Sequence, residues 1–312
     1  MKVLVSGGSG FIGQALCRSL VRQGMSVTIL SRNPPQAKPL QNQAVKVVGW
    51  DGMTTGGWEP ELATATAVIN LAGEPIAGGR WSQKRKQLIV DSRVKATRLL
   101  AQAISRLTDK PRLLINASGI GYYGTSQEIR FDERNGPGSD FFADLCMAWE
   151  EAALIAQPAG ARVVCLRIGM VLEKDGGALA KMVPPFRAYV GGPIAPGTQW
   201  VSWIHRADLV GLIEWALLNQ EVGGPVNAVA PEPVTMNELC NVLGKVLHRP
   251  SWLPVPAFAL RLVFGELSSF MTTGQRVTPK VALDGGYQFR YPRLDSALRA
   301  IFMETTASEV NP

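Results

Sequence analysis

The chain has 312 residues, 46% of them hydrophobic and 18% charged, and a formal net charge of +7 at pH 7. This composition is typical of a globular protein with a hydrophobic core, and the length suits one large domain or a domain with an appended lobe. No apolar run reaches about eighteen residues, so no transmembrane helix is predicted. Lys and Arg are scattered, and their densest cluster, Lys84-Arg85-Lys86, lacks interleaved aromatic residues. We therefore expect neither a nucleic-acid partner nor a membrane partner.

Cysteine and histidine usage predicts a protein of a reducing compartment without a metal. The four cysteines form no Cys-x-x-Cys pair, and Cys17 and Cys165 lie within apolar patterns. We expect buried free thiols, and with only two histidines in the chain we expect no zinc site. A first strand that begins at residue 2 leaves no room for a signal peptide, so the sequence predicts a cytoplasmic protein.

The first thirteen residues carry the clearest motif. A β-branched run over 2–6 predicts a buried strand, and a helical pattern begins at Phe11. Gly7, Gly10 and Gly13 follow the strand at three-residue spacing. A strand, a glycine turn and a helix in this order are typical of a dinucleotide site, and each glycine then has its own role. Gly7 adopts a positive φ, Gly10 lets the main chain approach a pyrophosphate, and Gly13 lets the helix pack closely on the strand. The helix N-terminus then offers N–H groups and its positive dipole end to the phosphates.

The second strand, over 27–30, is followed by the residues that select the cofactor. An NAD site places an Asp or Glu here to accept a hydrogen bond from the ribose 2′-OH, whereas an NADP site needs a cation for the 2′-phosphate. The chain reads Ser31-Arg32-Asn33, and its first acidic residue is Asp51, after a third strand over 45–50. Ser31 offers a hydroxyl and Arg32 a planar guanidinium suited to phosphate, so the sequence predicts NADP.

Strands and helices go on alternating up to residue 172, which predicts a parallel, doubly wound sheet with right-handed crossovers. After the fourth strand, the small segment Leu71, Ala72 and Gly73 would let a cofactor pass close to the backbone. Predicted strands cover 67–71, 113–118 and 162–167, and predicted helices cover 81–107 and 141–156. The expected fold class is α/β: a doubly wound parallel-sheet Rossmann fold with a smaller C-terminal α/β lobe.

From about residue 172 the pattern changes to shorter and more irregular elements. The predicted elements are a loop-rich stretch over 176–199, a strand over 200–204, a helix that His205 to Asp208 begin and that ends near 219, a strand over 225–229, a helix from a capping box at 235–238 to 246, and helical stretches over 257–270 and 294–302. We assign 1–172 with 200–230 to an NADP-binding Rossmann domain, 176–199 with 231–302 to a substrate-side lobe, and 303–312 to a tail.

Motifs spread over residues 1–302 resemble the extended short-chain dehydrogenase/reductases. They are the glycine turn, Asn70-Leu-Ala-Gly73, Ser118 after the fifth strand, Leu166-Arg-Ile-Gly169 and the segment 203–209. Gly121-Tyr-Tyr-Gly124, Trp149-Glu-Glu151 and the segment 254–279 are similar to an atypical branch, the NAD-dependent epimerase/dehydratase family proteins with a small extra C-terminal domain. By this resemblance, NADP contacts would include Gly10, Phe11, Ile12, Ser31, Arg32, Leu71, Ala72, Glu74, Arg93 and Val171. Arg93 would face the cofactor from the long helix, or else lie on the helix surface.

The chain departs from this family at the catalytic pair. Active members use Tyr-x-x-x-Lys about twenty-five residues after the serine, where the lysine lowers the pKa of the tyrosine and the tyrosine exchanges a proton with the substrate. None of the five tyrosines here has a lysine four residues later, and the expected register holds Cys146 and Glu150. The usual carbonyl-reduction mechanism is therefore not encoded at the usual place. Cys146 could be a nucleophile or a buried structural thiol, and His205 could point into the cleft or be structural.

Three catalytic candidates remain near the usual site. Ser118 could polarise a substrate carbonyl or merely end the strand against the nicotinamide. Tyr122 or its neighbour Tyr123 could supply a phenol from a different backbone position. Glu150 could act as a general base if burial raised its pKa, or it could be a solvated helix carboxylate.

Two functions are compatible with these residues. The first is an NADP-dependent oxidoreductase or epimerase acting on an unknown small polar substrate, for which a nucleotide-sugar is one option, held between the sheet and the lobe. The second is a catalytically silent NADPH-binding regulatory protein that works through protein partners, and some members of the similar branch carry a label that links them to bacterial or plastid cell division. The loss of Tyr-x-x-x-Lys favours the second function. The choice between monomer and dimer stays open.

Overall fold

The computed structural model describes residues 1–37, 44–79, 81–107 and 111–303. Within these residues, the centre of the protein is a seven-stranded sheet with the order β11-β7-β5-β4-β1-β2-β3, and all neighbouring strands run parallel. The strands are β1 (Lys2–Ser6), β2 (Ser26–Ser31), β3 (Val45–Gly49), β4 (Ala67–Asn70), β5 (Leu113–Gly119), β7 (Arg162–Ile168) and β11 (Gly224–Ala228). The strand order reverses at β1 and β4, and open α/β sheets bind ligands at the carboxyl ends of such a pair. The predicted fold class is confirmed.

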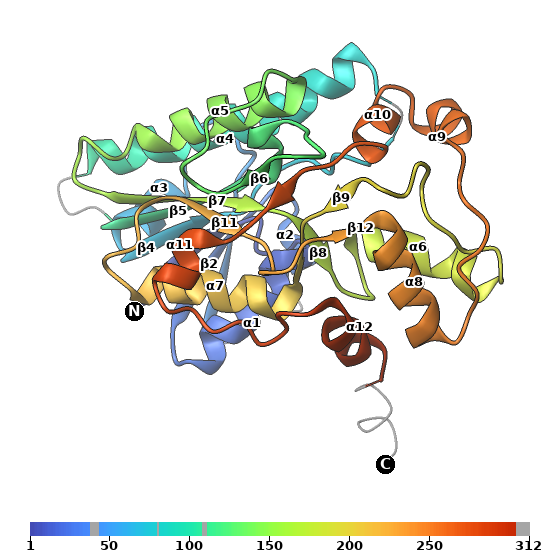
Figure 1. Ribbon diagram of the computed structural model, residues 1–312. Helices are drawn as coiled ribbons and strands as arrows, with labels where there is room; N and C mark the ends of the chain where they lie inside the picture. The colour runs from blue at the N-terminus through green and yellow to red at the C-terminus, as the bar shows by residue number, and fades with distance from the viewer. Residues whose placement is uncertain (38–43, 80, 108–110, 304–312) are drawn as a thin grey trace.

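Helices cover both faces of the sheet (Figure 1). One face carries α1 (Phe11–Arg22) and α7 (Arg206–Leu218), and the other carries α3 (Glu59–Ala63), α4 (Gln83–Arg106) and α5 (Phe141–Leu154). Alternate residues of one strand serve the two layers, since Val3 and Val5 pack with α1 and α7 whereas Leu4 packs with α4. Burial on both faces explains why the strands are continuously apolar. A short helix, α2 (Pro34–Ala37), follows β2.

The C-terminal lobe has its own hydrophobic core beside the carboxyl edge of the sheet (Figure 1). Its helices are α6 (Gly177–Arg187), α8 (Met236–Leu247) and α12 (Leu294–Met303), with α9 (Ala257–Phe264) and α10 (Leu267–Met271) above them. Two small pairs of strands connect the lobe to the sheet: β8 (Met170–Leu172) with β10 (Trp203–His205), and β9 (Trp200–Val201) with β12 (Val234–Thr235). The predicted capping box at the start of α8 is present, from Thr235 to Glu238.

The last part of the chain returns to the Rossmann half. β13 (Arg276–Val277) pairs in parallel with β6 (Arg130–Phe131), and α11 (Lys280–Asp284) lies against β11. The partly buried side chain that joins these segments is Glu133, whose carboxylate accepts hydrogen bonds from the backbone N–H groups of Asn227, Lys280 and Val281. The lobe and the sheet are therefore connected by backbone pairing as well as by side-chain packing.

Three predicted elements differ from the structure. Helix α6 occupies the predicted loop at 177–187 in spite of Pro184 and Pro185, because Leu179, Val183 and Phe186 are buried in the core of the lobe. The predicted strand over 200–204 is two strands, β9 and β10, broken at Ser202, whose side chain is hydrogen-bonded to the segment 275–277. The predicted helix over 257–270 is split at Gly265, which has a φ of +63°. Residues 304–312 of the predicted tail lie outside the described residues.

Candidate functional site

The glycine turn after β1 has the geometry that the sequence predicts. Gly7 has a φ of +71°, and a Cβ there would lie 2.7 Å from the carbonyl carbon of Leu71. Gly13 packs so closely on the turn that its Cβ would lie 2.2 Å from the carbonyl oxygen of Gly7. Within the described chain no side chain caps the N-terminus of α1. Its first N–H groups are therefore available to an anionic ligand, as the phosphates of a dinucleotide require.

A groove of about 570 Å³ runs from this turn to the ends of β2 and β3. Seven of the predicted cofactor residues line it: Gly7, Gly10, Ser31, Arg32, Leu71, Ala72 and Gly73. Asp51 lines the same groove. The structure thus brings the predicted residues from three separate strand ends together in one continuous groove.

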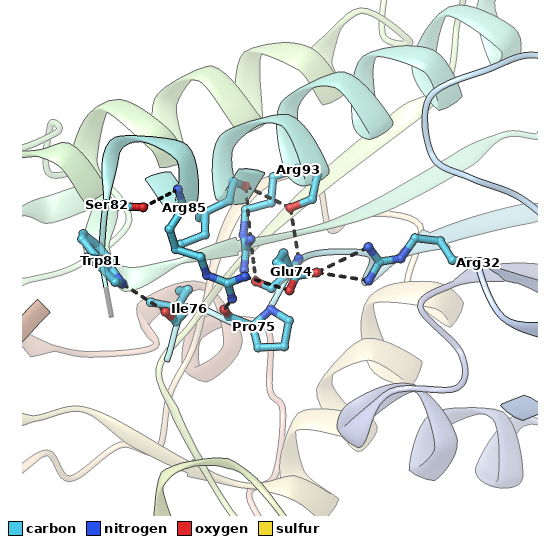
Figure 2. Close-up of polar contacts among 10 residues, drawn as sticks. Arg32, Glu74, Pro75, Ile76, Trp81, Ser82, Arg85 and Arg93 are labelled. Carbon is cyan, nitrogen blue, oxygen red and sulfur yellow. Dashed lines mark hydrogen bonds and ion pairs between the residues drawn. The ribbon is translucent and has the colours of Figure 1, made fainter. Parts of the chain in front are cut away.

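Glu74, between the groove residues Gly73 and Pro75, pairs with two arginines (Figure 2). Its Oε2 lies 3.3 Å from Nη2 of Arg32, and its Oε1 lies 3.0 Å from Nη1 of Arg85. Burial acts to raise the pKa of Glu74, but hydrogen bonds and charges of Arg85 and Arg32 outweigh it and hold this pKa below its ordinary value. The Arg32 side chain is nevertheless 61% exposed. Its guanidinium can therefore reach a phosphate in the groove.

Arg93 is buried behind the groove, so the alternative of a helix-surface arginine is wrong. Its Nη1 donates to the carbonyl oxygens of Glu74 at 3.0 Å and Ile89 at 3.3 Å. A Cβ on Gly73 would lie 3.0 Å from the guanidinium carbon. Burial lowers the pKa of Arg93 to about 10. Arg93 supports the loop between β4 and α4 from behind, and a contact of Arg93 with the cofactor stays a prediction.

The remaining predicted cofactor residues, Phe11, Ile12 and Val171, are not among the residues that line the groove. The Phe11 ring centre is 4.9 Å from the guanidinium carbon of Arg206, and the ring packs against Gly176. Ile12 and Val171 pack against the hydrophobic core between the sheet and α1. Their roles as cofactor contacts stay predictions.

The three predicted catalytic residues, Ser118, Tyr122 and Glu150, meet around Arg167. Ser118 Oγ donates to Glu150 Oε1 at 2.7 Å, and Arg167 donates to both carboxylate oxygens of Glu150 at 2.9 and 2.8 Å. The guanidinium carbon of Arg167 lies 3.4 Å from the centre of the Tyr122 ring. Glu150 and Arg167 are 8% and 3% exposed. Glu150 is therefore a buried ion-pair partner, and the alternative of a solvated helix carboxylate is wrong.

The two neighbouring tyrosines have different surroundings. The Tyr123 hydroxyl donates to Asn227 Oδ1 at 2.8 Å and accepts from Arg167 Nη1 at 3.0 Å, and burial raises the pKa of Tyr123 to about 12. Tyr123 is thus a structural group with its hydrogen bonds satisfied. Tyr122 is half-buried, and among the described residues its hydroxyl has no hydrogen-bond partner. Of the two tyrosines, Tyr122 is the one with an unpaired hydroxyl in the described part of the chain, and its contact with a substrate stays a prediction.

Cys146 occupies the register of the usual tyrosine. The thiol is buried, and this burial, reinforced by the charge of Glu150, raises its pKa to about 11. A thiol with this pKa is protonated at neutral pH and is a poor nucleophile. The surroundings favour the structural alternative for Cys146.

Arg167 is the residue that the sequence reasoning missed. In the sequence, the segment 166–169 was used only as one of the motifs that resemble the short-chain dehydrogenase/reductases. The available signal was a charged residue near the carboxyl end of an apolar strand, because such a charge needs a partner if it is buried. The partner could not be identified, since Glu150 lies on a helix seventeen residues earlier.

His205 begins α7 and has a structural contact. Its Nδ1 accepts a hydrogen bond from the backbone N–H of Ala207 at 3.0 Å, and its ring stacks on Tyr291 at 4.1 Å between ring centres. Burial, with the charges of Arg290 and Arg206, lowers the pKa of His205 from 6.5 to about 4. The unfolded chain therefore binds a proton at pH values where the native protein does not.

Stability is accordingly expected to fall as the pH decreases from about 6.5 towards 4, and His205→Asn is expected to make this fall shallower. Asparagine retains an N-cap acceptor for Ala207 but does not titrate. The change in slope should approach one proton, about 1.4 kcal/mol per pH unit. Urea unfolding at a series of pH values measures it. His248→Asn is the control, because His248 is exposed and has a φ of +53° that asparagine tolerates. Equal slopes in both variants would show that His205 is not the titrating group.

A second hollow, a cavity of about 930 Å³, lies between the carboxyl edge of the sheet and the lobe. Pro75 lines both the groove and the cavity, so the loop between β4 and α4 separates them. Within the described ranges no group of three or more His, Cys, Asp or Glu residues could hold a metal ion. In the same ranges every helix is too short or too polar to span a membrane.

Comparisons with known proteins show the family of the chain. The family model of the NAD dependent epimerase/dehydratase family matches residues 3–229, and a domain of unknown function (DUF1731) matches residues 255–301. The chain belongs to the NAD dependent epimerase/dehydratase family. It is 42% identical over 306 residues to the chloroplastic epimerase family protein SDR39U1 homolog of Arabidopsis thaliana, covering 96% of this chain and 86% of that protein.

Two further relatives extend the similarity to other organisms and to a solved structure. The epimerase family protein YfhF of Bacillus subtilis is 40% identical, with 97% of this chain and 99% of that protein covered. The crystal structure of human epimerase family protein SDR39U1 with NADPH is 35% identical, with a TM-score of 0.86 and 96% and 99% of the two chains covered. The resemblance read from the sequence motifs is thus confirmed over both parts of the chain.

Proposed function

We propose that the chain is an NADP(H)-binding protein of the oxidoreductase class and that the groove at β1, β2 and β4 holds the dinucleotide. The observation that carries this proposal is Arg32, exposed in the groove after β2, where an NAD site would have a carboxylate. The glycine turn leaves a cradle that a Cβ would fill, and the human relative was solved with NADPH. Bound NADPH would supply hydride chemistry. The residues of the chain bind it and set the proton donors beside it.

Binding of NADPH is expected to be at least tenfold tighter than binding of NADH, and Arg32→Ala is expected to remove most of this preference. Arg32 would pair with the 2′-phosphate that only NADPH carries, and a factor of ten corresponds to about 1.4 kcal/mol. A fluorescence titration of both nucleotides measures the ratio. Arg22→Ala, which removes an exposed cation at the other end of α1, controls for net charge. If neither nucleotide binds the unmodified protein, the dinucleotide proposal fails.

We further propose an oxidoreductase or epimerase reaction on a small molecule, with Tyr122 as the proton donor. Ser118 and Glu150 would then act as positioning residues. Ser118 donates to Glu150 and Glu150 pairs with Arg167, so together they hold the Arg167 guanidinium against the Tyr122 ring. A screen of carbonyl compounds for NADPH oxidation tests turnover. Loss of turnover in Tyr122→Phe with unchanged NADPH binding is the result that this assignment requires.

The second candidate is a catalytically silent NADPH-binding regulatory protein that acts through protein partners, with a link to cell or plastid division. The closed network of Ser118, Glu150 and Arg167 favours it, because the position of the usual lysine holds a carboxylate that is already paired. On this proposal the cofactor binds without turnover. NADPH binding together with no NADPH consumption across the screen would favour it over catalysis.

A further inference from the structure

The walls of the cavity beside the groove are mostly apolar. Most of the side chains that line it are apolar, among them Ile76, Phe142, Met182, Met236, Phe270 and Met271. They come from the loop after β4, from α5, α6, α8 and α10, so the walls are formed by both halves of the chain. Its volume of about 930 Å³ is in the range of sites for drug-sized ligands.

Charge is nearly absent from these walls. Lys181 is the single charged side chain among the described residues that line the cavity. It is exposed on α6, and its Nζ donates to the carbonyl oxygen of Ala77 at 3.2 Å, so it stands at the rim. A ligand that placed phosphate groups inside the cavity, away from Lys181, would bury their charges without a cationic partner among the described lining residues, which is unfavourable.

The polar side chains of the lining are already used by the protein. Ser202 Oγ donates to the carbonyl oxygen of Gln275 and accepts from the N–H of Val277, and the Gln275 amide donates to the carbonyl oxygen of Ile120. Thr273 Oγ1 donates to the carbonyl oxygen of Ser269. These groups hold the walls together and offer few hydrogen bonds to the hydroxyl groups of a sugar.

Gln199 is the exception in the lining. It is 1% exposed, and its Nε2 donates to the carbonyl oxygens of Ile194 and Met271. Its Oε1 has no partner within the described chain. A buried amide oxygen without a partner is unfavourable, and one donor group on a ligand would satisfy it after a small side-chain movement.

The cavity also lies where a substrate of the bound cofactor has to lie. Gly169 and Ile120, which line it, follow the ends of β7 and β5 next to Ser118. Pro75 lies in the wall that the groove and the cavity share, and hydrogen bonds hold this wall in place (Figure 2). Arg85 donates to Glu74 and to the carbonyl oxygen of Pro75. Trp81 Nε1 donates to the carbonyl oxygen of Ile76 at 3.1 Å. The two hollows are therefore neighbours across one fixed loop.

We propose that the cavity binds an uncharged, predominantly apolar small molecule that carries one hydrogen-bond donor for Gln199, in place of the small polar substrate expected from the sequence. The class includes long-chain and isoprenoid alcohols. That this ligand is the substrate rests on the proposed NADP(H)-dependent function. The binding of the ligand in the cavity does not depend on that function.

The test is a titration of the full chain with N-phenyl-1-naphthylamine, an uncharged apolar fluorophore, followed by competition with farnesol and with UDP-glucose. We expect one molecule of the fluorophore per chain, displaced by farnesol and not by UDP-glucose. Met182→Trp and Ala178→Phe, which lie one turn apart on α6 and fill the cavity, should each weaken the binding at least tenfold. NADPH titration of the same samples shows that each variant is folded, because the groove is a separate site.

The matched control removes an exposed apolar surface that could also bind the fluorophore. Phe258 and Leu262 of α9 are each 77% exposed, and the double variant Phe258→Ser, Leu262→Ser should bind as the unmodified protein does. The proposal is overturned if this control loses binding while the α6 variants keep it, if UDP-glucose displaces the fluorophore, or if the unmodified protein binds NADPH but not the fluorophore. Binding of the fluorophore without NADPH overturns the proposed function and leaves the cavity assignment intact.

Discussion

Replacing Arg167 with methionine is expected to lower the free energy of unfolding by about 3–5 kcal/mol, because it would leave the Glu150 carboxylate buried without a counter-charge. The native pair is bidentate, and both side chains lie in the interior between β7 and α5. Ser118 Oγ could still donate to the carboxylate, but one neutral hydroxyl does not replace a guanidinium. Urea unfolding measures the change.

A second substitution and a control separate the ion pair from general packing. In the double variant Glu150→Gln, Arg167→Met most of the loss should be recovered, because the buried charge is gone. Arg299→Met is the matched control: Arg299 pairs with Asp295 at 2.8 Å, but both side chains are more than half exposed. Such a pair contributes about 0.3–0.5 kcal/mol. An Arg167→Met loss as small as the Arg299→Met loss would rule out the buried pair.

Gly10→Ala is expected to weaken NADPH binding at least a hundredfold, about 2.7 kcal/mol, with little change in thermal stability. The backbone of Gly10 has a φ of −81°, which alanine adopts readily. Apart from its chain neighbours, a Cβ there would meet one atom of the described residues within 4 Å, the carbonyl oxygen of Gly7 at 3.2 Å. The added methyl group would instead occupy the groove where a pyrophosphate has to approach the main chain. Titration with NADPH and a melting curve on the same sample test both parts.

Gly57→Ala provides the control for this substitution. Gly57 is exposed, and a Cβ there would meet no atom within 4 Å. Its NADPH affinity and melting temperature should equal those of the unmodified protein. If Gly10→Ala binds NADPH as tightly as Gly57→Ala does, the pyrophosphate does not lie on the glycine turn.

Local patterns predicted the fold and the groove well. The strand and helix at each end of the glycine turn are adjacent in sequence, so Gly7 and Gly13 could be assigned their roles from spacing alone. The capping box at Thr235 and the N-cap at His205 were likewise readable, because a cap involves residues only two or three positions apart. Apolar strands buried on both faces stand out in any sequence of this class.

Features that depend on distant residues were not predictable in this way. Two prolines argued against a helix at 177–187, and only the packing of Phe186 and its neighbours against α8 explains α6. The pairing of Glu150 with Arg167 joins a helix to a strand, and no local pattern records it. The apolar character of the cavity comes from segments as far apart as Ile76 and Met271.

The parallel pairing of β6 with β13 has a consequence for the synthesis of the protein. β6, at 130–131, is synthesised well before its partner at 276–277. Until then the carboxylate of Glu133 lacks the N–H groups of Lys280 and Val281, and Phe131 lacks its cover by Val277. Domains generally fold from the N-terminus during synthesis. Here Phe131 and Glu133 stay uncovered until the segment 276–281 has been synthesised, and exposed apolar surface during that interval favours aggregation.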